Sequence, residues 1–139
     1  MKKIKKNKSL YLGQEVGFKT SISNSQIDLF AKISGDNNYI HMNKKKSIER
    51  GFEDRVVHGA YIIALFSRII GRFLPTDSTL LLFMDTKFKN PAYPNKIIKI
   101  YGVVKEFLTS TNCITINLTA KYNRSGKIIS TSTAIVRIK

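Results

Sequence analysis

The sequence predicts an α+β fold in which an antiparallel β-sheet wraps around one long, buried central helix. Residues 59–73 are apolar on nearly every side, a pattern typical of a helix that is buried rather than laid on a surface. Four segments rich in Ile, Val, Thr, Phe and Tyr follow with short links, and consecutive strands of this kind favour antiparallel pairing. The chain has 139 residues, 42% of them hydrophobic, which is the length of one domain with enough apolar side chains for a core.

The first part of the chain is expected to form a strand and a short helix. Residues 14–22 alternate apolar and polar side chains, which is the period of a strand. Ser23 and Gln26 match a capping box, so a helix should begin there. Its apolar side chains repeat at helical spacing as far as Ile33, and Gly35 should end it.

The remaining elements follow from composition and turn residues. The polar residues 36–55 are expected to be a loop or an irregular excursion ahead of the helix at 59–73, which Pro75 and Asp77 should terminate. The run Asn-Arg-Ser-Gly at 123–126 is typical of a hairpin turn. The strands expected after the helix are 79–88, 96–107, 113–122 and 127–137.

The formal net charge of +15 indicates a chain that attracts anions. Nucleic acids, acidic proteins, anionic membranes and phosphorylated ligands all qualify. Abundant Lys, Asn and Ile, as in chains from AT-rich genomes, would explain the charge without any partner, and both explanations stay open. The basic residues are scattered and form no zinc-finger, RNP-type or helix-turn-helix pattern, so nucleic acid is not expected as a partner. The dense basic cluster lies in residues 1–9, which we expect to be a tail ahead of a domain at 10–139.

The sequence predicts a cytoplasmic protein with no membrane partner. No apolar run approaches the roughly 20 residues of a membrane-spanning helix, and none of signal-peptide length follows the basic N-terminus. The single cysteine, Cys113, cannot form an internal disulfide, which suits a reducing cytosol. We expect no metal or other cofactor, because no cluster has metal-ligand spacing and no Gly-rich phosphate loop is present.

A carboxylate and an imidazole stand close together in the polar stretch. Asp36 and His41 follow the predicted first helix, and such a pair converging on one water can act as acid and base. This chemistry suits the addition of water to a polarised double bond, or its removal. The alternative is structural: Asp36 would cap the turn after Gly35, and His41 would be a surface loop residue.

Gly59 opens the predicted central helix. Free N–H groups and the helix dipole favour an anion at this end, and glycine allows the backbone to approach a bound group closely. His58, the second of the two histidines, could simply be a core histidine whose ring nitrogens are hydrogen-bonded to the backbone. Ser67 is most simply a helix-packing residue bonded back to its own backbone.

These segments resemble the MaoC-like, (R)-specific enoyl-CoA hydratase family, which has the single hot dog fold. The family's hydratase signature matches at Phe30 and Ile33-Ser34-Gly35-Asp36-Asn37-Asn38-Tyr39-Ile40-His41, with Ser47 as its final small residue. The start and middle of the family's central helix match Val57-His58-Gly59-Ala60 and Leu65-Phe66-Ser67, and its next strand and turn resemble Phe88-Lys89-Asn90-Pro91-Ala92-Tyr93-Pro94. The similarity spans about residues 10–138.

The resemblance implies hydration of 2-enoyl thioesters and dehydration of (R)-3-hydroxyacyl thioesters without a metal or redox cofactor. Asp36 and His41 would share the water and Gly59 would be the oxyanion donor, with support from Asn38, His58 and Ser67. One departure is Tyr39 in place of the family's proline, which removes a constraint on the loop that aims His41. The side chains expected to line the acyl pocket are Tyr39, Phe52, Tyr61, Leu82 and Met84.

The resemblance also implies partners. A homodimer is expected, because a single hot dog leaves sheet edges that need covering and the family joins two sheets edge to edge. The substrate would be an acyl-CoA or an acyl carrier protein thioester, and the charge favours the carrier-protein form slightly. The basic residues expected at the rim are Lys44, Lys45, Lys46, Arg50 and Arg55. The alternatives are a non-catalytic module that binds acyl thioesters or nucleic acid, and thioester hydrolysis.

Overall fold

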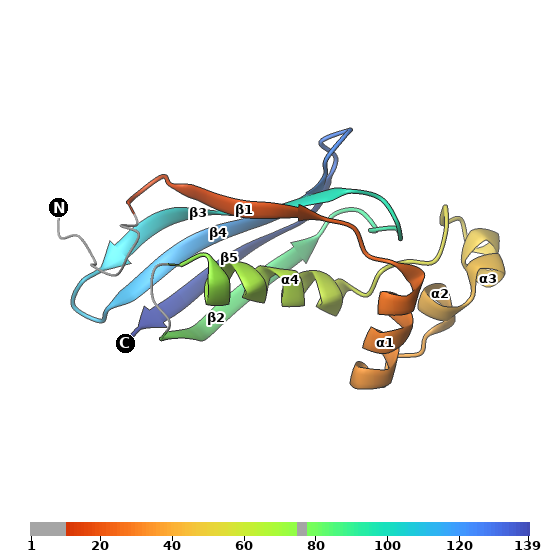
Figure 1. Ribbon diagram of the computed structural model, residues 1–139, viewed down its shortest axis with the longest axis horizontal. Coiled ribbons are helices and arrows are strands. Elements are labelled where there is room, and N and C mark those ends of the chain that lie inside the picture. The colour runs from red at the N-terminus through yellow and green to blue at the C-terminus, as the bar shows by residue number, and fades with distance from the viewer. Residues whose placement is uncertain (1–10, 75–77) are drawn as a thin grey trace.

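The structure is a computed structural model that describes residues 11–74 and 78–139, so the basic tail predicted at 1–9 and the predicted helix breakers at 75 and 77 lie outside the described residues. The elements are β1 (Glu15–Thr20), α1 (Asn24–Ser34), α2 (Tyr39–Met42), α3 (Lys44–Glu49), α4 (Gly59–Arg72), β2 (Thr79–Phe88), β3 (Ile98–Leu108), β4 (Cys113–Tyr122) and β5 (Ile128–Ile138) (Figure 1). In the ranges described, no helix combines the length and the apolar character that crossing a membrane requires.

The strands of the described chain form one five-stranded antiparallel sheet in the order β1-β3-β4-β5-β2. The predicted strands are confirmed, with starts and ends that shift by a few residues. Side chains on one face of β3 and β4 are fully buried, as the alternation in Ile98, Ile100, Ile114, Ile116 and Leu118 shows. That buried face carries the core on which the long helix packs.

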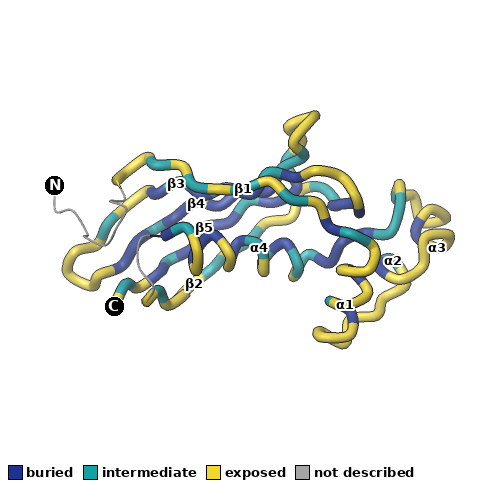
Figure 2. The backbone as a smooth tube through the Cα atoms, in the orientation of Figure 1, coloured by how far each residue is buried: buried dark blue, intermediate teal, exposed yellow. Residues whose placement is uncertain are grey.

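Helix α4 lies along the sheet, and one of its faces is buried (Figure 2). Ile62, Phe66 and Ile69 are at most 1% exposed and belong to the core. The prediction of a helix buried nearly all round is wrong for the single chain, because residues on the other face, such as Ala60 and Ala64, are exposed to solvent. The predicted α+β arrangement of one long helix against an antiparallel sheet is confirmed.

The polar stretch expected as a loop contains two short helices. Asn38 caps α2 by accepting a hydrogen bond from the Ile40 N–H, and Asn43 caps α3 by accepting one from the Lys46 N–H. Each such cap stabilises its helix by about 1 kcal/mol. The buried Ser47 hydroxyl then donates to the Asp54 carbonyl, so side chains rather than a long apolar period hold this excursion together.

Candidate active site

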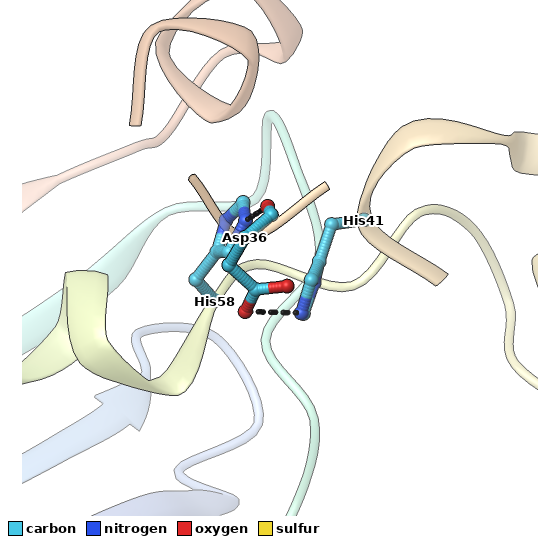
Figure 3. Close-up of side chains that lie close together, drawn as sticks. All are labelled: Asp36, His41 and His58. Carbon is cyan, nitrogen blue, oxygen red and sulfur yellow. Dashed lines mark hydrogen bonds and ion pairs between the residues drawn. The ribbon is translucent and has the colours of Figure 1, made fainter. Parts of the chain in front are cut away.

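Three separate segments bring Asp36, His41 and His58 together (Figure 3). Asp36 follows Gly35, which ends α1 in the left-handed conformation at φ 75°. His41 belongs to the short helix α2, and His58 is the residue that precedes α4. The Asp36 Oδ2 and His41 Nε2 atoms lie 3.6 Å apart, too far for a direct hydrogen bond but within reach of one shared water.

The tautomer of His41 is fixed by the backbone. Its Nδ1–H donates to the Val56 carbonyl oxygen at 2.6 Å, since a carbonyl can only accept. The Nε2 atom of the neutral ring is therefore an unprotonated acceptor, and it faces the Asp36 carboxylate. Two acceptors at this separation can each take one hydrogen of the same water, which leaves a lone pair of the water oxygen free to attack.

The pKa of His41 lies below its ordinary value of 6.5, chiefly because burial disfavours the charged ring. The hydrogen bond to Val56 and the Asp36 carboxylate oppose this lowering, while His58 and Arg55 add to it. The side chain of His41 is 10% exposed. His41 is consequently neutral at pH 7 and can take up a proton.

His58 supports the pair from behind. It is 1% exposed, and its Nε2–H donates to the Asp36 carbonyl oxygen at 2.8 Å. Its ring stacks on that of His41 with centroids 3.8 Å apart. The centroid of the Phe30 ring lies 5.0 Å from that of His58. The Nδ1 atom of His58 has no hydrogen-bond partner among the described residues.

Gly59 begins α4 beside these side chains. The Tyr61 N–H donates to the His58 carbonyl at 3.0 Å, so the N–H groups of Gly59 and Ala60 are the ones that remain available to an anion. A Cβ atom at Gly59 would lie 3.0 Å from the Phe88 ring, so the position is confined to glycine unless that ring moves. The structure thus places an electropositive helix end next to Asp36 and His41.

Two other predicted supports differ in outcome. The Asn38 N–H donates to Asp36 Oδ1 at 3.2 Å, so Asn38 orients the carboxylate directly. Ser67 is exposed on α4, and about 12 Å of helix separates it from Gly59. Within the described chain no hydrogen bond joins Ser67 to Asp36 or His41, so the predicted support of that pair by Ser67 is not seen in a single chain.

The predicted acyl-pocket residues are dispersed. The Tyr61 ring lies 5.2 Å from Phe30, which in turn contacts His58, so Tyr61 is tied to the site. Phe52 is half-buried, Met84 packs against the core, and Leu82 is 44% exposed on the edge strand β2. Tyr39 is 40% exposed, with the Arg50 guanidinium 5.8 Å from its ring centroid.

Of the predicted rim residues, Arg55 is placed wrongly by the sequence. Its side chain is only 12% exposed and bonds to the His41 carbonyl and to Asp28. Lys44 pairs with Asp54 at 3.0 Å, whereas Lys45 and Lys46 are exposed on α3. The place of Arg55 beside the motif loop predicts a rim position. Its partners Asp28 and His41 are distant in the sequence, so no local pattern reveals these contacts.

Asp36, His41 and His58 each present one metal-ligand type of atom within 4.8 Å of the others. The sequence spacing did not predict this grouping, since His58 is brought in by the fold. A cation would find one exposed carboxylate and two imidazoles here. A separate cavity of about 730 Å³ lies between the β4–β5 turn and the loop before β3, and its lining includes Glu53, Tyr93, Lys96, Tyr122 and Arg124 but none of the three.

Comparison with known proteins identifies the family of this chain. Residues 8–126 match the family model described as "MaoC like domain". The (R)-specific enoyl-CoA hydratase of Aeromonas caviae is 25% identical over 130 residues, covering 94% of this chain and 96% of that protein. The 3-hydroxybutyryl-CoA dehydratase of Methylorubrum extorquens is 30% identical over 90 residues, covering 65% of this chain and 57% of that protein, so this alignment spans little more than half of its length.

Solved structures agree on the fold. The (R)-hydratase of A. caviae involved in PHA biosynthesis superposes with a TM-score of 0.88 at 23% identity, covering 94% of this chain and 98% of that one. An (R)-hydratase of Pseudomonas aeruginosa in its unliganded form gives a TM-score of 0.84 at 28% identity, covering 91% and 81%. The hot dog fold expected from the motifs is confirmed. Because the family model covers most of the residues, this chain belongs to the MaoC-like domain family.

Proposed function

We propose that this protein is a hydro-lyase that adds water to 2-enoyl thioesters and removes it from (R)-3-hydroxyacyl thioesters. The observation that carries the proposal is the Asp36 carboxylate facing the unprotonated His41 Nε2 at 3.6 Å beside the N-terminus of α4. The names of the relatives, two (R)-specific enoyl-CoA hydratases and a 3-hydroxybutyryl-CoA dehydratase, support the substrate class and the (R) configuration.

In the hydration direction the water donates one hydrogen to Asp36 and the other to His41. Its oxygen bonds to C3 as one of the two groups takes its proton, and the π electrons move toward the thioester oxygen to give an enolate. That proton then returns to C2 as the enolate collapses. Dehydration is the reverse sequence. Either Asp36 or His41 fits the role of the group that takes and returns the proton, while the other holds the water.

The enolate needs a donor where its charge develops. The Gly59 N–H at the start of α4 is the proposed donor, because helix-end amides are fixed before the reaction and cost no reorganisation. Oxyanion donors of this kind are worth on the order of 100- to 1,000-fold in kcat. The reaction needs no metal or redox cofactor.

A homodimer is part of the proposal. The edge strand β2 exposes a run of large apolar side chains, namely Leu80, Leu81, Leu82 and Phe83, each at least 41% exposed. Exposed edge strands with apolar side chains invite pairing with another chain. A second copy would also cover the open face of α4, which carries Ser67. The free and buried thiol of Cys113 is consistent with the proposed cytoplasmic location.

The direct test is hydration of crotonyl-CoA, followed by loss of the enoyl thioester absorbance and by chiral analysis of the product. Asp36→Asn and His41→Ala should each remove nearly all activity while leaving the melting temperature unchanged within a few degrees. Glu15→Gln, which breaks an exposed ion pair with Lys99 on the sheet, serves as the control and should keep full activity. Chelation with EDTA should leave the rate unchanged.

Other results would redirect the assignment. Near-normal rates in both pair variants would overturn it. Release of free thiol without hydration would indicate a thioesterase. Saturable RNA or DNA binding in physiological salt, with no thermal shift from acyl-CoA, would indicate the binding module instead.

A further inference from the structure

We propose that Arg55 is a positioning residue that holds His41 in its working orientation by tying α2 to α1. The inference rests on the proposed function of the Asp36 and His41 pair. It assigns a role to a side chain that touches neither the water nor the thioester.

The contacts of Arg55 bridge two helices. Its Nε–H donates to the His41 carbonyl oxygen at 2.5 Å, and its Nη2–H donates to Asp28 Oδ1 on α1 at 2.5 Å. Nη1 lies 3.4 Å from Asn24 Oδ1, also on α1, and Nη2 lies 4.0 Å from the Met42 sulfur on α2. Lysine cannot replace this arrangement, because its ammonium lacks the planar fork that reaches two acceptors in fixed directions.

The segment that carries Arg55 holds His41 at two points. The carbonyl of the next residue, Val56, accepts from the His41 ring at Nδ1, while the Arg55 side chain holds the His41 backbone. The Val56 N–H also donates to the Ile40 carbonyl at 2.8 Å. Removing the guanidinium leaves these bonds in place but removes the one that holds the His41 carbonyl, so the Nε2 lone pair can shift away from Asp36.

The helix that carries His41 has little stability of its own. Helix α2 has four residues, fewer than a helix needs to persist without tertiary contacts. Tyr39 is its first residue, where proline is well tolerated, and Asn38 before it has φ −51° and ψ 138°, the extended conformation that precedes proline. Tyr39→Pro would therefore stiffen α2 from within and reduce its dependence on Arg55.

Charge gives a second readout. The charged or titratable groups that act on the His41 ring are the Asp36 carboxylate, the His58 ring and the Arg55 guanidinium, and the last contacts the His41 carbonyl and is itself paired with Asp28. A neutral side chain at position 55 removes a cation that opposes protonation of His41. The pKa of His41 should rise in Arg55→Gln and stay near its present value in Arg55→Lys.

The experiment compares Arg55→Lys, Arg55→Gln and Asp28→Asn with the control Glu15→Gln, using crotonyl-CoA. Both Arg55 variants should lower kcat by tenfold or more, up to about 100-fold, with little change in KM, because misplacement of a catalytic group by about 1 Å costs that much. Asp28→Asn keeps the guanidinium and should give a smaller loss. Adding Tyr39→Pro to Arg55→Lys should restore most of kcat.

The titration of His41 followed by NMR reads the same contacts without substrate. If wild-type protein hydrates nothing but the His41 pKa still rises in Arg55→Gln, the proposed function fails and the contact survives. If Arg55→Gln does not fold, the kcat values of Asp28→Asn and of Arg55→Lys with and without Tyr39→Pro still test the proposal. Unchanged kcat and pH profile in Arg55→Gln, or an equal loss in Glu15→Gln, would overturn the proposal.

Discussion

Asp36 and His41 differ in how far their side chains are exposed to solvent. The Asp36 side chain is 53% exposed, whereas that of His41 is 10% exposed and its ring is wedged between the Val56 carbonyl and His58. The proposed pair therefore joins a solvated carboxylate to a desolvated imidazole whose pKa is lowered by burial. Pairs whose surroundings differ in this way are well suited to acid–base work.

The pH dependence of hydration should follow His41. Its pKa is lowered from 6.5, so the neutral, active ring persists at pH 6.5 and is lost only as the pH falls through the lower folded-state value. The acid limb of kcat/KM for crotonyl-CoA should therefore bend below pH 6.5. An inflection above that value, with His41 titrating at the same pH by NMR, would contradict the lowered pKa.

At this scale the sequence predicted that Asp36, His41 and His58 belong to one site, and the structure brings them together, but it did not predict the contacts of Arg55. Asp36, His41 and Gly59 stand in motifs that resemble those of a known family, and that resemblance singled them out. The contact of Arg55 with His41 and the stacking of His58 on His41 join residues that are distant in the chain. Such contacts are set by how α1, α2 and α4 pack, which no local pattern encodes.

At the scale of elements, the regular strands were predictable and the short helices were not. β3 alternates buried and less buried residues over 98–104 and β4 does so over 114–120, a period that is visible in the sequence. Helices α2 and α3 have four and six residues, too few for a helical period to appear. Their caps at Asn38 and Asn43 are recognisable only once the helix is known.

Helix α4 offers a matched pair of glycines for testing its N-terminus. Gly59→Ala places a methyl group 3.0 Å from the Phe88 ring and should shift either that ring or the first turn, lowering kcat by about 10-fold or more. Gly71→Ala on the same helix meets nothing within 4 Å, so it should leave kcat unchanged and stabilise the helix by up to about 1 kcal/mol. Steady-state kinetics and thermal melts measure both effects. Equal kcat values in the two variants would show that the Phe88 ring moves and the first turn keeps its position.

The whole molecule has one exposed apolar edge, among its described residues, that a second copy would cover. Phe83 is 52% exposed on β2, which pairs only with β5 in the sheet. Light scattering at micromolar concentration should report a dimer, and Phe83→Lys should shift it toward monomer because a charge on an edge strand blocks pairing. Arg124→Glu at the far β4–β5 turn is the charge-changing control. A wild-type protein that stays monomeric would exclude the dimer.

The last prediction concerns the carrier of the substrate. Coenzyme A and the phosphopantetheine arm of a carrier protein end in the same thioester, so Asp36 and His41 cannot distinguish them. A carrier protein presents a whole acidic helix face, and the gain from steering by a chain of charge +15 grows with the charge of the partner. Lys45, Lys46 and Arg50 remain exposed near α2, whereas Arg55 is engaged inside and Lys44 is paired with Asp54. We expect the crotonyl carrier-protein form to match or exceed crotonyl-CoA in kcat/KM at low salt.

That advantage should shrink as salt is raised to 0.1 M, where screening acts over about 10 Å. Reversal of Lys45 and Lys46 to Glu should lower kcat/KM for the carrier-protein substrate and change kcat little, because these side chains act on encounter rather than on the reacting atoms. Reversal of Lys19 on β1 and Lys105 on β3, both exposed and away from α2 and α3 in the chain, makes the same change in net charge and serves as the control. The steering role fails if the two substrates respond equally to both reversals, because a general field would then act rather than a docking surface around α3.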